Sequence, residues 1–146
     1  ELPCNGAVFA HDCAASEMGA LMQEPMVWVA SRPYHCNKGE RVPLALFDRA
    51  CWRRDTALKA LNDAEQAHHI VLSSESVSGI RAAIATGLAV GVVARSSVES
   101  SMQILDEQQG FPTLPQCVLR LARGTDSSPA IDAMVTEIES GFATFK

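Results

Sequence analysis

The chain has 146 residues, of which 47% are hydrophobic and 20% are charged, and its formal net charge is -5. This composition indicates a globular protein that is long enough to bury a hydrophobic core. The negative charge argues against binding of a nucleic acid backbone by this segment, because such binding depends on clustered Lys and Arg.

Strands are predicted in the first third of the chain. Residues 7–10 form a short apolar stretch, and residues 25–30 form a continuous apolar, β-branched and aromatic run, which is typical of a strand buried on both faces. A polar loop over residues 34–41 leads to another buried strand at residues 42–47. Pro43 restricts this strand, because proline is tolerated at the beginning of a strand or at a sheet edge.

Two helices separated by a strand are predicted next. Apolar residues recur at helical spacing from about residue 52 to residue 67, and residues 70–72 form the following strand. Ser76 is placed to cap the second helix, and Gly87 is its expected left-handed terminator. The buried face of this helix is predicted to contain Ile80, Ala83, Ile84 and Leu88.

A strand, a short helix and a further strand complete the middle of the chain. Residues 89–94 are predicted as a strand, and Ser96 or Ser97 is placed to cap a short helix. That helix is expected to carry Val98, Met102 and Leu105 on its apolar side. A turn at residues 110–112 precedes a strand at residues 117–121.

The chain ends in a strongly amphipathic helix, with Ser128 as N-cap, Pro129 at the first helical position and an apolar face that reaches Phe145. Strands that alternate with helices over short connections predict an α/β fold with a mainly parallel sheet. In such sheets ligands bind at the carboxyl ends of the strands, where helix N-termini present backbone N–H groups. The two strand-to-helix junctions, before residues 52 and 77, are therefore the predicted binding region.

The sequence lacks the patterns that are typical of a membrane or secreted protein, of a metal site and of an enzyme. No apolar run reaches the roughly 20 residues of a membrane helix, and no secretory signal pattern begins the chain, so we expect a cytoplasmic location and no membrane partner. Five scattered cysteines without a Cys-x-x-Cys pair predict reduced thiols and no metal site. The triplet His11-Asp12-Cys13 is not accompanied by a nucleophile elbow or a phosphate loop, so neither catalysis nor a cofactor is expected.

Three segments together resemble the effector-binding domain of LysR-type bacterial transcriptional regulators. Residues 43–58 are similar to the first strand-to-helix junction of that domain, and residues 74–93 are similar to its Ser-x-Ser entry into a helix and a following strand. Residues 24–29 resemble the strand that crosses between its two lobes. Ala89 stands where the family more often has a second glycine. The resemblance extends from about residue 7 to the end of the chain.

The resemblance implies a two-lobed, periplasmic-binding-protein-like α/β domain that catalyses nothing. Residues 1–30 would supply the remainder of lobe I and the first crossing strand, residues 31–120 would form lobe II, and residues 121–146 would return to lobe I. The family's opening strand-helix-strand-helix segment and its winged helix-turn-helix have no counterpart here, so DNA would be bound only through that absent N-terminal domain. The uncovered surfaces of an incomplete first lobe predict a homo-oligomer or a dimer with an exchanged segment.

The implied ligand is a small-molecule effector held between the lobes. Helix N-termini favour negatively charged groups, so a carboxylate is the expected chemistry. The predicted effector-binding residues open the first helix, open the second helix or lie on the crossing strands: Ala50, Cys51 and Trp52; Ser74 and Ser76; Ala30, Ser31 and Leu121. Structural explanations stay open for some of them. Ser76 is also explained as an N-cap, Trp52 as a core residue, and the adjacent Arg53 and Arg54 as a solvated helix face.

Cys51 supports an alternative function, a thiol-based redox sensor. A thiol at a helix N-terminus near Arg49, Arg53 and Arg54 is in surroundings that favour the reactive thiolate form. The run from Cys51 to Asp55 also resembles the peroxide-sensing branch of the family. In that branch a resolving cysteine follows a few turns later, and the matching position here is Ala60. The other reading is an inert or ligand-contacting thiol.

Overall fold

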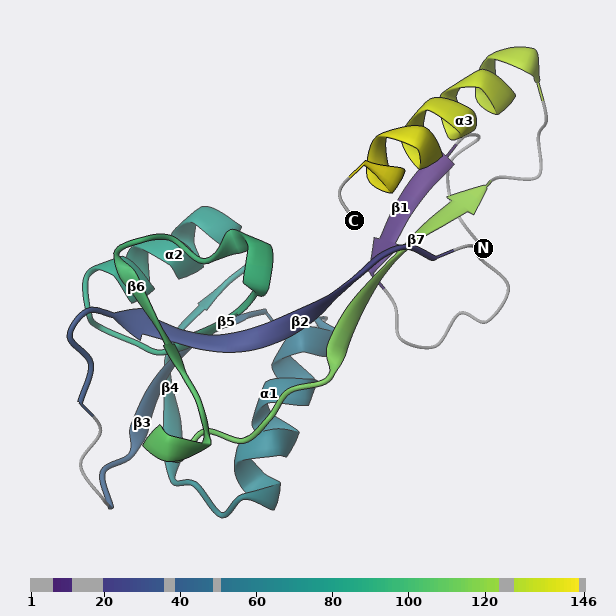
Figure 1. Cartoon of the computed structure of the whole chain (residues 1–146). Coiled ribbons are helices and arrows are strands. Elements are labelled where there is room, and N and C mark those ends of the chain that lie inside the picture. Colours follow the sequence, from purple (N-terminus) through teal and green to yellow (C-terminus); the bar gives the residue numbers. More distant parts are fainter. Residues whose placement is uncertain (1–6, 12–19, 36–38, 49–50, 124–127, 145–146) are drawn as a thin grey trace. The chain divides into compact units, whose positions relative to one another are not determined.

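The computed structural model describes residues 7–11, 20–35, 39–48, 51–123 and 128–144, which form strands and helices (Figure 1). The chain divides into two units. Unit 1 consists of Glu1–Glu24 and Gln116–Lys146, and unit 2 consists of Pro25–Pro115. The chain therefore passes between the units at Glu24/Pro25 and at Pro115/Gln116, a few residues before the two boundaries expected from the sequence.

Unit 2 is built on a mixed set of strands. Strand β3 (Val42–Phe47) pairs in parallel with β4 (His68–Ser74), and a parallel bridge joins Leu44 of β3 to Val90. Val90 leads directly into β5 (Gly91–Ala94), which pairs antiparallel with β2 (Ala20–Ser31). Strand β6 (Met102–Leu105) pairs antiparallel with the other side of β2. The strands therefore follow the order β4, β3, β5, β2, β6.

Two helices cover opposite faces of these strands (Figure 1). Helix α2 (Val77–Ala85) buries Ile80, Ala83 and Ile84 in one cluster with Val29 and Ala45 of the strands. Because strand side chains alternate between faces, the buried neighbours of Ala45 in β3 point the other way. Helix α1 (Trp52–Asp63) contacts β3 and buries Ala57 and Leu61. The chain crosses from β3 to β4 in one direction along the sheet and from β4 to β5 in the other. Because such crossovers are right-handed, the two helices are expected on opposite faces.

Close packing of α2 requires a glycine in β5. A Cβ atom at Gly91 would lie 2.5 Å from Ile84 Cδ1 and 3.0 Å from Ile84 Cγ1. Gly91 is thus a site where a side chain on the strand would push the helix away from the sheet.

Among the described residues, unit 1 contains two complete strands, the first five residues of β2 and the last helix. Strand β1 (Ala7–His11) pairs antiparallel with β7 (Gln116–Arg123), and α3 (Pro129–Ala143) contacts β1. The Ser128 hydroxyl accepts a hydrogen bond from the Ile131 amide at 3.3 Å, and Pro129 begins the helix. The predicted cap and start of this helix are confirmed. Phe145, the predicted end of its apolar face, lies outside the described residues.

One predicted element is wrong. Residues 96–105 do not form a helix: a single 3-10 turn (Arg95–Ser97) is followed by β6, in which Met102 pairs with Ser31 and Leu105 with Trp28. The three-residue spacing of Met102 and Leu105 imitates a helix pattern, and both side chains are indeed buried. Backbone pairing with β2, which the local sequence does not encode, decides the conformation.

Three further predictions need correction. The pairing is mixed rather than mainly parallel, because β2 runs antiparallel to both of its unit 2 neighbours. Helix α1 ends at Asp63 instead of near residue 67, and β4 already begins at His68. Gly87 does adopt the predicted left-handed conformation, with φ of 77°, but it follows the helix end at Ala85, so Leu88 is 67% exposed and not part of the buried face.

Candidate functional site

The openings of α1 and α2 lie at the same edge of the parallel strand pair. Phe47, the last residue of β3, is in register with Ser74, the last residue of β4. Each strand is followed within a few residues by a helix, with Cys51 at the N-cap position of α1 and Ser76 at that of α2. Carboxyl ends of parallel strands thus bring these two helix N-termini, each with a positive partial charge, to one edge of unit 2.

Arg54 connects the strands and the helix that meet at this edge. Its Nη1 atom donates hydrogen bonds to the Phe47 carbonyl oxygen at 3.0 Å and to Ser73 Oγ at 2.9 Å. The side chain is half-buried, so the interpretation of Arg54 as a solvated surface residue is wrong. One guanidinium connects the end of β3, the end of β4 and the first turn of α1, an arrangement that suits its several rigidly held donors.

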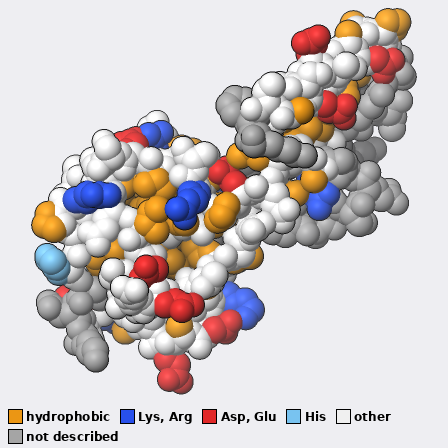
Figure 2. All heavy atoms as spheres, viewed as in Figure 1, with side chains coloured by type: hydrophobic (Ala, Val, Ile, Leu, Met, Phe, Trp, Pro, Cys, Tyr) orange, Lys and Arg blue, Asp and Glu red, His pale blue; other side chains and the backbone are white. Residues whose placement is uncertain are grey.

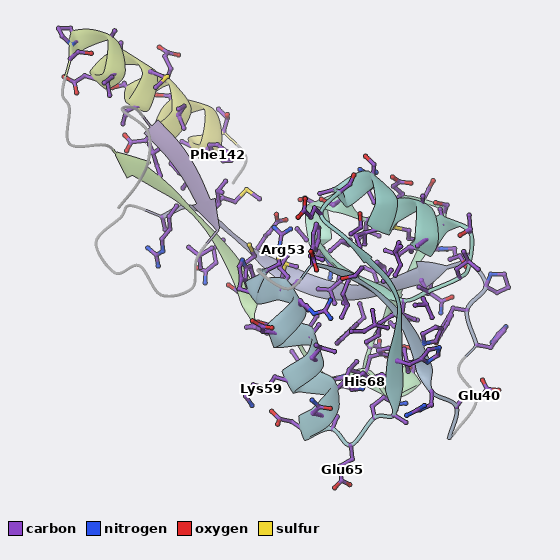
Figure 3. All side chains as sticks on the ribbon, turned by 180° about the vertical axis from the view of Figure 1, so that it is seen from behind. Glu40, Arg53, Lys59, Glu65, His68 and Phe142 are labelled. Atoms are coloured by element: carbon purple, nitrogen blue, oxygen red, sulfur yellow. The ribbon has the colours of Figure 1, made fainter. Side chains whose placement is uncertain are left out.

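Arg53 is likewise not simply solvated. Its guanidinium carbon lies 5.6 Å from the centre of the Phe47 ring and 5.8 Å from the centre of the Trp52 ring, distances at which a cation is attracted by an aromatic face. Figure 3 shows Arg53 near the opening of α1, whereas Glu65 lies beyond the other end of that helix. The half-buried Trp52 is therefore packed by a charged neighbour at the edge, rather than lying in the core.

Ser74 and Ser76 form a small hydrogen-bonded turn. Ser74 Oγ accepts from the Ser76 amide at 3.0 Å and donates to the Ser76 carbonyl oxygen at 3.4 Å. A Cβ atom at Gly79 would lie 2.9 Å from Ser74 Oγ, so the glycine makes room for this hydroxyl. Ser76 occupies the N-cap position, yet its side chain makes no capping hydrogen bond and is exposed. Capping alone therefore does not explain the Ser76 hydroxyl.

Cys51 is a free thiol at the opening of α1. Its side chain is half-buried and makes no capping hydrogen bond, while its carbonyl oxygen accepts from the Arg54 amide at 3.0 Å. Cys117 is the other cysteine in the part of the chain that the structure describes, and it is 3% exposed. Ala50, which was predicted beside Cys51, lies outside the described residues.

The structure does not bring Ala30 and Ser31 to this edge. Because β2 is antiparallel to β5, its last residues lie at the amino end of β5, where Val29 pairs with Gly91. A Cβ atom at Gly87 would lie 3.0 Å from Ser31 Oγ, which places Ser31 beside the end of α2 rather than its opening. Ala30 is 1% exposed. The part of β2 at the carboxyl edge is instead its entry into unit 2, where Met26 pairs with Ala94.

Leu121, the last predicted site residue, belongs to unit 1. It pairs with Phe9 in the β1–β7 ladder and is 8% exposed. Within the described parts of the chain, no helix is long and apolar enough to cross a membrane. The same residues contain no group of three or more His, Cys, Asp or Glu side chains arranged to hold a metal ion.

Comparisons with known proteins agree on one family. The sequence pattern of the LysR substrate binding domain matches residues 8–143. The HTH-type transcriptional regulator PecT of Dickeya dadantii (strain 3937) is 30% identical over 122 residues, which cover 83% of this chain and 39% of PecT. The chain therefore spans well under half the length of that relative.

Solved structures share the fold. The apo regulatory domain of HypT from Salmonella typhimurium has a TM-score of 0.78 at 12% identity, covering 95% of this chain and 73% of that one. The regulatory domain of CcmR from Synechocystis PCC6803, solved with 2-PG, has a TM-score of 0.69 at 16% identity, covering 93% and 73%. The predicted two-lobed α/β class is confirmed by these likenesses.

Proposed function

Because this chain belongs to the LysR substrate binding domain family, as its sequence resemblance predicted, we propose that it senses a small molecule through the helix openings at Cys51 and Ser76. The observation that carries this proposal is that both openings lie at one edge of unit 2. At that edge the Ser76 side chain is exposed and makes no capping hydrogen bond. Occupancy would regulate the intact protein by favouring the arrangement that binds the ligand more tightly.

The chemistry of the edge favours an anionic ligand. Two helix N-termini present backbone N–H donors with positive partial charge, and the guanidinium groups of Arg53 and Arg54 lie in the first turn of α1. Both features stabilise a carboxylate more than a neutral or cationic group. The related fold of CcmR is solved with 2-PG, which supports a small-molecule ligand for this fold.

The whole protein is proposed to act on DNA in the cytoplasm. PecT is an HTH-type transcriptional regulator, and only part of its length corresponds to this chain. We propose that the intact protein binds DNA through a helix-turn-helix segment outside the 146 residues, and that effector binding here controls that contact.

A thermal-shift screen with Ser76 variants tests the proposal. Small carboxylates should raise the melting temperature of the chain, whereas their uncharged amides should not, because the amides lack the charge that the helix N-termini favour. Ser76→Ala should reduce the shift, since one hydroxyl contact is lost. Ser100→Ala, a matched change at another exposed serine, should leave it intact. Absence of any carboxylate-specific shift, or an undiminished shift in Ser76→Ala, would contradict the proposal.

A thiol-based sensor is the second candidate, and the position of Cys51 favours it. A half-buried thiol at the start of a helix of twelve residues is accessible and lies near positive partial charge. With hydrogen peroxide as oxidant, the thiol would become a sulfenic acid and release water. Mass spectrometry after mild peroxide treatment should then show one added oxygen on Cys51 and none on the buried Cys117. Unmodified Cys51 under conditions that oxidise a small-molecule thiol would reject this candidate.

A further inference from the structure

The carboxyl edge that carries the two helix openings continues past β3 to β5. The Ala45 amide donates to the Val90 carbonyl oxygen at 2.9 Å, and the Val90 amide donates to the Pro43 carbonyl oxygen at 2.8 Å, so the chain enters β5 parallel to β3. Arg95 directly follows β5 and therefore lies at this edge, one strand away from the opening of α1. Adjacent strands are about 4.8 Å apart, a step that an arginine side chain can span.

The segment after β5 is also held beside α2. Arg81 of α2 forms an ion pair with Glu99, and Val98 packs against the buried cluster to which α2 contributes. Arg95 begins this segment, and its side chain is exposed. The segment that starts at Arg95 therefore contacts the helix whose opening belongs to the proposed sensor site.

Beside β2 this edge opens into a cavity of about 760 Å³, within the range of about 300–1,000 Å³ that is common for small-molecule sites. Arg95 lines it together with Met26, which pairs with Ala94, and with the end of β6 and the segment that follows β6. On the other side of β2, Trp28 pairs with Leu105. Both β5 and β6 thus end where β2 enters unit 2, about 10 Å apart across the two strand spacings. The cavity therefore extends the edge already described and is not a separate site.

The cavity presents mainly polar groups to a ligand. Trp28 and Phe111 line it but are each 2% exposed, so they support the wall without forming its accessible surface. Apart from Pro25, the exposed lining side chains are polar: Arg95, Asp106, Glu107, Gln108 and Thr113. Figure 2 shows acidic and basic side chains around apolar ones on one face of unit 2. A purely apolar ligand would therefore bury little apolar area here.

Two of these polar groups are carboxylates that neighbouring groups hold in place. Asp106 Oδ1 accepts from the Gln108 amide at 2.8 Å, and Glu107 Oε1 accepts from the Thr113 hydroxyl at 2.9 Å. A carboxylate has about four acceptor positions, so each of the two can accept further hydrogen bonds. Hydroxyl groups are donors that match such acceptors without adding negative charge.

We propose that the sensed molecule is a hydroxylated carboxylate that lies along this edge, an assignment that rests on the function proposed above. Its carboxylate would lie between the helix openings and Arg95, and its hydroxyl groups would donate to Asp106 and Glu107. The positive groups at one part of the edge and the acceptors at the other then each meet a matching group of one ligand. Arg95 is thereby a specificity-determining residue of the sensor site.

The test is isothermal titration calorimetry of the 146-residue chain with three six-carbon compounds. D-gluconate has the carboxylate and the hydroxyl groups, hexanoate has only the carboxylate, and sorbitol has only hydroxyl groups. Gluconate should bind at least about tenfold more tightly than either of the others, because each of them lacks one set of hydrogen bonds. Hexanamide, the uncharged counterpart of hexanoate, tests the underlying carboxylate-sensing function separately.

Two variants and one matched control assign the contacts. Arg95→Gln should weaken gluconate and hexanoate alike, by about tenfold, because it removes the charge that faces the carboxylate. Glu107→Gln should weaken gluconate but not hexanoate, since only gluconate donates to this side chain, and the glutamine still accepts from Thr113. Arg41→Gln, at an exposed arginine outside the cavity lining, should bind all compounds as the parent does.

The outcomes separate this proposal from the function on which it rests. If hexanoate binds no more tightly than hexanamide, carboxylate sensing itself is rejected. If hexanoate binds more tightly than hexanamide, carboxylate sensing stands, and the proposal is overturned by any of three results. These are gluconate binding no tighter than hexanoate, sorbitol binding as tightly as gluconate, and Arg95→Gln binding as the parent does.

Discussion

Single residues at the edge of unit 2 have roles that their sequence neighbourhood does not reveal. Arg53 and Arg54 follow a helix start among polar residues, and a surface location is the natural expectation. In the structure Arg54 bonds to Phe47 and Ser73, which are seven and nineteen positions away. Such partners are brought together by the sheet register, and helical periodicity contains no information about them.

Replacing Arg54 is expected to destabilise the fold. Arg54→Met keeps an apolar stem but leaves the Phe47 carbonyl and the Ser73 hydroxyl without their charged donor. The free energy of unfolding should fall by about 1–2 kcal/mol, toward the lower part of the range for charged hydrogen bonds because the side chain is only half-buried. Urea denaturation measures the change, with Arg41→Met as the exposed control. Equal stability of both variants would show that the two bonds contribute nothing net.

At the scale of elements, the sequence predicted best those strands and helices whose local side-chain pattern favours the backbone conformation that they adopt. β3 begins and ends where its apolar run does, and α3 begins where Ser128 and Pro129 predict. β6 was mistaken for a helix because its conformation is imposed by β2. Ala30 and Ser31 lie away from the helix openings for a related reason: strand direction determines which end of β2 reaches the carboxyl edge, and direction is a property of pairing.

The contact between α2 and β5 gives a prediction for a pair of substitutions. Gly91→Ala should cost about 1–3 kcal/mol of stability, because the new methyl group would overlap Ile84 Cδ1. Adding Ile84→Val removes that atom, so the double variant should lose less than the sum of the two single losses. Thermal or chemical denaturation of all four proteins measures the coupling. Strict additivity would mean that Ile84 moves aside at no cost.

At the scale of the whole molecule, the family and the two-unit organisation followed from the order of weak motifs, each of which is uninformative alone. The location of the cavity within unit 2 did not follow from the order of these motifs. The cavity beside β2 is formed by residues from both ends of the unit 2 segment, for example Pro25 and Leu114. No local pattern marks such residues as neighbours.

Self-association is expected from the exposed apolar side of α3. None of its described side chains is buried, and Met134 is 43% exposed. Sedimentation velocity over a concentration series should show a species larger than the monomer, because an exposed amphipathic helix face favours a protein partner. Met134→Glu should shift the distribution toward monomer, whereas Ser140→Glu, the same charge at an exposed polar position of α3, should not. A single monomeric species at high concentration would contradict this expectation.

Strand β2 continues without a break across the boundary between the units, and the first residue after that boundary is Pro25. Proline has no amide hydrogen, so the ladder of β2 lacks one rung at that position. The strand that links the two units therefore passes their boundary through a residue with a fixed φ and no amide donor.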